Sequence, residues 1–201
     1  MNSPRFIAVV GGSGSGKSWL AANLLAELGS TAKLLSLDDF YRDLGHLPEP
    51  ERDEVNFDDP AAIDWDALRD VLDCLASGMP AQLPCYDFTT HTCHPDLQPF
   101  EPARVILLDG LWLLHPAWLR ERFAFSVFVD CPADERLRRR IERDVMTRGR
   151  TPESVIRQFT QHVQPMHLKF VEPQRDWATR RVKSPLSDVE LAELAAASLG
   201  S

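Results

Sequence analysis

Short apolar runs recur along the chain between longer segments of mixed polarity. Four of them predict buried strands, at residues 5–10, 33–37, 104–109 and 125–130. A loop or a helical stretch follows each run, and this alternation is typical of a mostly parallel sheet whose strands are joined by crossover helices. The pattern therefore predicts an α/β fold in which helices flank the sheet.

Helix signals lie between and after these runs. Residues 19–28 predict a helix closed by Gly29, and residues 64–77 predict one closed by Gly78. Residues 187–199 are rich in Ala, Leu and Glu and predict an amphipathic helix. We expect this last helix to pack on the core and to take no part in chemistry.

The region after the fourth run predicts two helices around a turn. Residues 134–144 predict a basic helix and residues 146–151 a turn. A second helix is expected to begin at Pro152, because proline suits the first position of a helix. Pro165 predicts a kink or an interruption in that second helix, because its nitrogen carries no hydrogen.

Length and charge narrow the class of protein. With 201 residues, 44% of them hydrophobic, the chain predicts a single domain over 1–201 with an insertion at about 40–100. The formal charge of −8 disfavours nonspecific binding to nucleic acid or an anionic membrane. No apolar run approaches the ~20 residues of a membrane span, and no signal-peptide pattern opens the chain. We expect a cytoplasmic protein with a small-molecule partner.

The four cysteines could be free thiols or, in part, ligands of a zinc site. None of the four forms a C-x-x-C pair, so they predict free thiols: Cys74, Cys85, Cys93 and Cys131. Two thiols and two imidazoles, from Cys85, His91, Cys93 and His94, would suffice to hold zinc. Their spacing matches no familiar structural zinc pattern, so we favour a strand and loop that carry them without a metal.

A glycine-rich segment follows the first apolar run directly and completes the pattern G-x-x-x-x-G-K-[ST]. Its residues are Gly11, Gly12, Ser13, Gly14, Ser15, Gly16, Lys17 and Ser18. Glycines let the backbone curl so that amide N–H groups face inward at a helix start, where anions are favoured. We expect the loop to cradle the triphosphate of a nucleotide, with Lys17 at the β and γ phosphates and Ser18 as a Mg²⁺ ligand.

Asp109 ends the third apolar run, where a magnesium-holding carboxylate is expected beside a phosphate loop. An alternative is that Asp109 only caps a turn. The next residue is Gly110, which cannot activate water as a glutamate could, and no N-K-x-D guanine-reading motif occurs. These features favour phosphoryl transfer to a bound acceptor over an ATPase or GTPase switch.

Seven arginines fall between residues 136 and 150 and predict an anion-facing, Arg-rich lid at about 143–152. A solvated helix face is the alternative for any one of them, and we expect it to explain Arg136, Arg138 and Arg139.

Two adjacent carboxylates, Asp38 and Asp39, follow the second run at the sheet edge where ligands bind. One of them could accept the proton of an acceptor hydroxyl, although capping or turn formation explains the position equally well.

Several further motifs resemble the uridine/cytidine kinases, within the phosphoribulokinase and uridine kinase group of P-loop kinases. The likeness runs from Gly11 to about Trp177 and rests on the segments SLDDFYR (36–42), NFDDP (56–60), PCYDFTTHT (84–92), FVD (128–130), RDVMTRGR (143–150) and VQPMHLKFVEP (163–173). The resemblance implies transfer of the γ-phosphoryl of ATP, with Mg²⁺, to the 5′-hydroxyl of a pyrimidine ribonucleoside. It leaves assembly into a homo-oligomer open.

The resemblance also implies roles for single residues. Asp38 matches the catalytic base, with an added role near Mg²⁺, and Arg143 and Arg148 match lid arginines over the triphosphate. The nucleoside would be held by aromatic walls at Phe57 and Phe88, by base-reading groups at Tyr86 and His91, and by ribose contacts from Asp58, Arg140, Arg150 and Gln158.

Three departures from the family pattern accompany these matches. Cys93 stands where the family has an arginine, Asp109 where it has a glutamate, and residues 178–183 form a poor version of the expected last strand. Two other functions stay open at this point. One is a kinase for another ribose-bearing or sugar acceptor, such as nicotinamide riboside, and the other is a nucleotide-binding regulatory protein without turnover.

Overall fold

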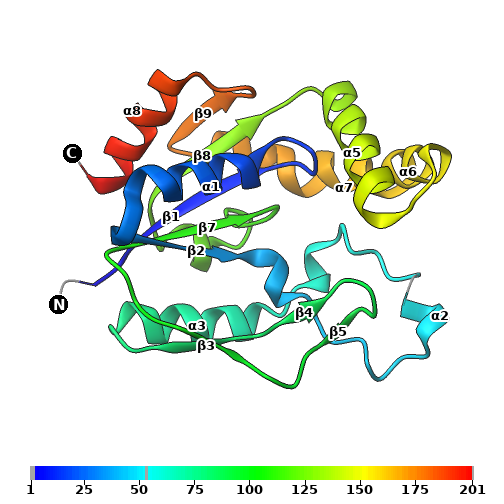
Figure 1. Cartoon of the computed structure of the whole chain (residues 1–201), viewed down its shortest axis with the longest axis horizontal. Helices are drawn as coiled ribbons and strands as arrows, with labels where there is room; N and C mark the ends of the chain where they lie inside the picture. The colour runs from blue at the N-terminus through cyan, green and yellow to red at the C-terminus, as the bar shows by residue number, and fades with distance from the viewer. Residues whose placement is uncertain (1–2, 53, 201) are drawn as a thin grey trace.

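A five-stranded parallel sheet forms the centre of the computed structural model, which describes residues 3–52 and 54–200 apart from the side chain of Arg148 (Figure 1). In spatial order its strands are β2 (Ala32–Ser36), β7 (Val105–Gly110), β1 (Arg5–Gly11), β8 (Phe123–Asp130) and β9 (Arg180–Lys183). The four strands predicted from apolar runs are confirmed, and so is the α/β fold class. The poorly patterned segment 178–183 still supplies an edge strand, β9, paired with β8.

Helices cover both faces of the sheet. On one face, α1 (Lys17–Leu28) and α8 (Asp188–Leu199) pack against the odd-numbered side chains Ile7 and Val9 of β1. On the other, α3 (Trp65–Ala76) packs against the even-numbered side chains. Because successive strand residues point to opposite faces, one apolar strand supplies two cores. The predicted packing role of the last helix is confirmed.

Local signals set the ends of these helices. Asp64 caps α3 by accepting from the Ala67 amide, and Ser187 and Glu190 form a capping box at the start of α8. Gly29 ends α1 with a positive φ of 55° and opens a short 3₁₀ turn over Gly29–Thr31. The helix signals in the sequence therefore place these elements to within two residues.

The insertion between β2 and β7 consists of short elements beside α3. They are a 3₁₀ turn at Leu37–Phe40, α2 (Glu49–Arg52), a 3₁₀ turn at Pro60–Ala62, and two antiparallel strand pairs. The outer pair is β3 (Ala81–Leu83) with β6 (Gln98–Phe100), and the hairpin between them in sequence is β4 (Tyr86–Asp87) with β5 (Thr92–Cys93). After β7, α4 (Ala117–Arg120) leads into β8. Figure 1 shows the β4–β5 hairpin and α2 at the same end of the molecule as α5 and α6, across a gap.

The lid differs from its prediction at one point. Helix α5 runs over Ala133–Arg148, so the turn predicted to begin at 146 is wrong by three residues. The helix continues until Gly149, whose positive φ of 62° lets its amide bond back to the Asp144 carbonyl. Helix α6 (Pro152–Gln158) then begins at Pro152 as the sequence predicts, and Thr151 caps it by accepting from the Ser154 amide.

Pro165 does not break the chain's helical path. Two π-helical segments, Phe159–Val163 and His167–Val171, flank α7 (Gln164–Met166), and a 3₁₀ turn over Glu172–Asp176 follows. Proline has no N–H to give to the helix ladder, and a wider turn avoids the clash of its ring with an upstream carbonyl. In the described part of the chain no helix is long and apolar enough to cross a membrane.

Candidate active site

The glycine-rich segment joins β1 to α1 and forms a tight phosphate loop. The Ser15 amide bonds to the Gly12 carbonyl at 3.0 Å, and Gly14 and Gly16 adopt positive φ angles of 79° and 95°. A Cβ atom at Gly14 would lie 2.4 Å from the backbone oxygen of Arg136, so only glycine fits there. No side chain caps the start of α1, which leaves its first amides for an anion.

Ser18 and Asp109 form an oxygen pair beside this loop. The Ser18 hydroxyl donates to Asp109 Oδ2 at 2.6 Å, and the Asp109 side chain is buried within β7. Asp109 is therefore no turn cap. Burial, with Asp38 and Asp109 nearby, raises the pKa of Asp39 to about 6. Hydroxyl and carboxylate oxygens amid excess negative charge fit Mg²⁺, whose remaining ligands are commonly water and phosphate.

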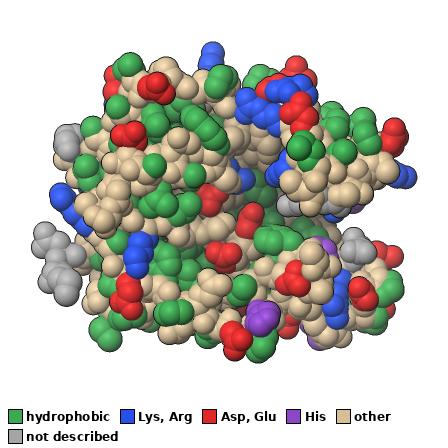
Figure 2. All heavy atoms as spheres, in the orientation of Figure 1, with side chains coloured by type: hydrophobic (Ala, Val, Ile, Leu, Met, Phe, Trp, Pro, Cys, Tyr) green, Lys and Arg blue, Asp and Glu red, His purple; other side chains and the backbone are tan. Residues whose placement is uncertain are grey.

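A cavity of about 390 Å³ opens between the insertion and the lid. Figure 2 shows the molecule hollowed between the α5–α6 segment and the β4–β5 hairpin, with acidic side chains nearby. The structure brings most of the sequence-predicted side chains to its wall: Ser13, Lys17, Asp38, Phe57, Asp58, Phe88, His91, Arg140, Arg143, Arg150 and Gln158. The sequence did not single out four others that line it: Tyr41, Thr89, Leu111 and Thr147. Arg148 is a predicted site residue whose side chain lies outside the described part of the structure.

Aromatic rings form the insertion side of the cavity. The rings of Phe57 and His91 stack with centroids 4.2 Å apart and an interplanar angle of 18°. The Tyr86 hydroxyl lies behind this wall, 3.2 Å from His91 Nδ1. His91 has a positive φ of 56°, which a non-glycine residue rarely adopts. Flat apolar surface beside a polar ring edge suits a flat heterocycle.

Asp38 and Asp58 line the same cavity as the aromatic rings and Lys17 of the phosphate loop. Ser36 caps the 3₁₀ turn by accepting from the Asp38 amide at 3.2 Å, and the Asp38 side chain lines the cavity. Burial raises the pKa of Asp58, and the nearby Arg140 guanidinium opposes this shift.

Two side chains hold the lid arginines: Asp144 of α5 and Gln158 of α6. Arg140 is buried and donates to Ser13 Oγ at 2.7 Å and to Gln158 Oε1 at 2.8 Å, and Arg150 donates to the same Gln158 oxygen. The fully buried Asp144 carboxylate lies between Arg140 and Arg143, at 3.4 and 2.8 Å from their Nε atoms. Gln158 and Asp144 thus fix guanidinium groups on the lid side of the cavity.

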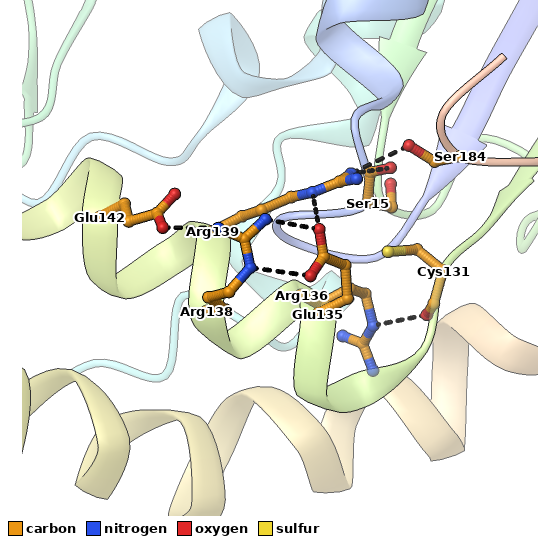
Figure 3. Close-up of polar contacts among 8 residues, drawn as sticks. All are labelled: Ser15, Cys131, Glu135, Arg136, Arg138, Arg139, Glu142 and Ser184. Carbon is orange, nitrogen blue, oxygen red and sulfur yellow. Dashed lines mark hydrogen bonds and ion pairs between the residues drawn. The ribbon is translucent and has the colours of Figure 1, made fainter. Parts of the chain in front are cut away.

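The solvated-face interpretation is wrong for Arg136 and Arg139 and holds for Arg138 (Figure 3). Arg136 is 2% exposed and donates to the Cys131 carbonyl and to Gln164. Arg139 Nη1 donates to the Ser15 carbonyl at 3.3 Å and to Ser184 Oγ at 2.9 Å. Arg136 and Arg139 make these contacts because α5 docks against the phosphate loop. Arg138 instead points outward and donates to Glu135 and Glu142.

His167 is a buried residue that the sequence did not mark. With Arg136 it packs behind the loop, where a Cβ on Gly12 would lie 2.7 Å from its Nδ1. Burial and the Arg136 charge lower the pKa of His167 to about 4, and the Glu172 carboxylate opposes them. For Asp144, the sequence signals were its spacing of four residues from Arg140 and its place in the motif RDVMTRGR (143–150).

The cysteines and histidines of the insertion are not gathered into a set of metal ligands in the described part of the chain. Cys93 pairs with Tyr86 across the hairpin, its amide bonds to Asp43, and its thiol contacts the Tyr41 carbonyl at 3.7 Å. Within the described residues, no three His, Cys, Asp or Glu side chains gather closely enough to hold a metal ion. The alternative of a zinc site therefore finds no support.

The fold and the site together define a class. A parallel sheet carries a phosphate loop, a strand-end carboxylate bonded to the loop serine, and a basic lid over a cavity with its own carboxylates. These are the parts of a phosphotransferase with the P-loop kinase fold.

Residues 6–189 match the family model "Phosphoribulokinase / Uridine kinase family". The chain belongs to this family and is an ATP-dependent kinase. It is similar to proteins named uridine kinase from Deinococcus deserti, at 46% identity over 87% of this chain and 85% of the relative, and from Chloroflexus aurantiacus, at 43% over 87% and 84%.

Solved structures share the fold at low sequence identity. A putative fructose transport system kinase from Silicibacter sp. TM1040 aligns with a TM-score of 0.75 at 21% identity, covering 90% of this chain and 91% of that one. Phosphoribulokinase from Rhodobacter spheroides aligns with a TM-score of 0.66 at 14% identity, covering 96% and 75%. At these identities the likeness concerns the fold alone.

Proposed function

We propose that the protein transfers the γ-phosphoryl group of ATP to the 5′-hydroxyl of a pyrimidine ribonucleoside, uridine or cytidine. One observation carries the proposal: a single cavity joins Lys17 of the phosphate loop to the Phe57–His91 stack, with Asp38 and Asp58 on its wall. Relatives named uridine kinase, at 43–46% identity, support the same acceptor. The cavity volume of about 390 Å³ suits a small ligand of nucleoside size.

At the acceptor end, the proposal gives each group a binding task. The pyrimidine would contact the Phe57 and Phe88 rings, and His91, oriented by Tyr86, would bond to its polar edge. Asp58 would accept hydrogen bonds from the ribose hydroxyls, with Arg140, Arg150 and Gln158 beside it. The 5′-hydroxyl would then point toward Asp38 and the phosphate loop.

At the reacting end, Asp38 would accept the proton of the 5′-hydroxyl as its oxygen bonds to the γ phosphorus, while the bond from that phosphorus to the bridging oxygen breaks and ADP leaves. Lys17, Arg143 and Arg148 would neutralise charge on the transferring group, and lid closure would exclude water. Ser18 and Asp109 would hold Mg²⁺, with Asp38 near it. When bound, the ion supplies charge neutralisation at the phosphate oxygens.

The test is a steady-state screen of acceptors with Mg·ATP, reading ADP release and the phosphorylated product. Uridine, cytidine, adenosine, D-ribose and nicotinamide riboside form the panel, and Lys17→Ala is the control for contaminating kinases. We expect saturable ADP release with uridine or cytidine. If nicotinamide riboside is the one acceptor of the panel that is phosphorylated, the acceptor is reassigned to it. If the protein binds ATP but phosphorylates no acceptor of the panel, the catalytic role is contradicted.

A further inference from the structure

Arg52, the last residue of α2, bridges two backbone carbonyls in the insertion. Its Nε donates to the Leu47 carbonyl at 2.9 Å and its Nη1 to the Thr90 carbonyl at 2.9 Å. Leu47 belongs to the loop before α2, whereas Thr90 belongs to the turn of the β4–β5 hairpin. One side chain therefore ties α2 to the turn that carries His91.

The peptide groups on both sides of His91 are held from the insertion. Thr90 supplies the carbonyl before His91, which accepts from Arg52, and the His91 carbonyl accepts from the Leu44 amide at 3.1 Å. Fixing both flanking peptide planes fixes the φ and ψ angles of the residue between them. This matters because His91 has a φ of 56°, and a histidine left to itself favours negative φ.

The backbone conformation decides where the imidazole lies. With this φ, the His91 ring stacks on Phe57 at 4.2 Å and places Nδ1 3.2 Å from the Tyr86 hydroxyl. Relaxation of His91 to negative φ would swing the ring away from both partners. The aromatic wall of the cavity thus depends on a contact made outside the cavity, since Arg52 is not among its lining residues.

We propose that Arg52 is a positioning residue for acceptor-base recognition, which it serves by holding the Thr90 carbonyl and so His91 in its left-handed conformation. This inference rests on the proposed function, since it takes the ligand of His91 to be the pyrimidine. Arg52 acts on the base only through His91, and its hydrogen bonds to the Leu47 and Thr90 carbonyls lie within the insertion. It sets nucleoside affinity and leaves the transfer step unchanged.

The first test is a split between KM and kcat. Arg52→Ala should raise KM for uridine about tenfold, the scale of a lost hydrogen bond from a charged donor, with kcat and KM for ATP unchanged. Arg52→Lys, which keeps one donor, should recover part of this loss. Arg42→Ala is the matched control, because the Arg42 side chain also bonds a carbonyl of the insertion, that of Ala61 at 3.2 Å, which is not a peptide group next to His91. An unchanged KM for uridine in Arg52→Ala would overturn the inference.

A double-mutant cycle with His91→Ala tests the route of the effect. If Arg52 acts through His91, the double variant should lose no more kcat/KM for uridine than His91→Ala alone. If the fold losses of Arg52→Ala and His91→Ala multiply in the double variant, Arg52 has a role independent of His91 and the proposal is contradicted. Thermal melting of each variant separates unfolding from lost affinity. Absence of pyrimidine-dependent turnover in the unsubstituted protein would instead reject the proposed function, so the two failures are distinguishable.

Discussion

Ser18 and Asp109 are joined by a 2.6 Å hydrogen bond although 91 positions separate them in sequence. The bond exists because β7 lies beside β1 in the sheet, with Asp109 opposite Val9, two residues before the phosphate loop. In P-loop kinases this edge of the sheet is where triphosphate and metal meet. Under the proposed function, the pair is therefore the feature that would tie the phosphate loop to Mg²⁺ binding.

Asp109→Asn should weaken Mg²⁺ binding, because it removes the carboxylate charge while keeping the shape of the side chain. We expect the Mg²⁺ concentration for half-maximal ADP release to rise at least about tenfold, from the loss of a charged interaction of about 1.5–3 kcal/mol. A Mg²⁺ titration at fixed ATP measures this. Asp130→Asn is the control, because Asp130 ends strand β8, which lies on the other side of β1 from β7, and pairs with Arg175. Equal Mg²⁺ dependence in Asp109→Asn and the unsubstituted protein would remove Asp109 from the metal site.

Asp38→Asn should lower kcat by at least about 10², the lower range for a positioned general base. KM for ATP should change little, because Lys17 and the loop amides still hold the triphosphate. Asp39→Asn removes the same charge one residue away and should lower kcat much less. Asp38 lines the cavity, whereas Asp39 is not among its lining residues and lies within range of the Asp109 charge. Initial rates with saturating uridine compare the two. A reversed order of effects would exchange the assignments, and full activity in both would rule out the base mechanism.

His91→Ala should reduce kcat/KM for uridine by an amount equal to about 1–3 kcal/mol, the scale of a polar contact left unpaired. The loss should be specific to acceptors that carry a pyrimidine, because His91 lies at the aromatic end of the cavity. Kinetics with uridine and with D-ribose as acceptors check this. If kcat/KM for uridine is unchanged, His91 does not contact the base.

The sequence predicted the sheet and the phosphate loop because both depend on contiguous residues. It could not separate Arg136 from Arg138, which lie two positions apart in one basic helix. The docking of α5 on the phosphate loop decides which of them is buried, and that contact joins segments more than 100 residues apart along the chain. Asp144 was missed for the same reason. Most of the predicted site residues line one cavity, and their individual roles remain predictions.

His167 leads to a prediction about stability and pH. Its pKa is lowered to about 4 in the folded protein, first by burial and then by the Arg136 charge, whereas an unfolded histidine titrates near 6.5. As pH falls from 6.5 toward 4, the unfolded chain therefore takes up a proton that the folded protein does not, and the free energy of unfolding decreases. At pH 5 this linkage amounts to about 2 kcal/mol, and at pH 7.5 it is close to zero.

His167→Gln should therefore flatten the pH dependence of stability, because glutamine fills a similar space and does not titrate. Urea unfolding at pH 7.5 and pH 5 measures the difference in unfolding free energy for each protein. The variant is expected to lose about 2 kcal/mol less than the unsubstituted protein between the two pH values. His94→Gln is the matched control, since the His94 side chain is 60% exposed. If His167→Gln and the unsubstituted protein lose stability equally on acidification, His167 is not the buried neutral group behind the phosphate loop.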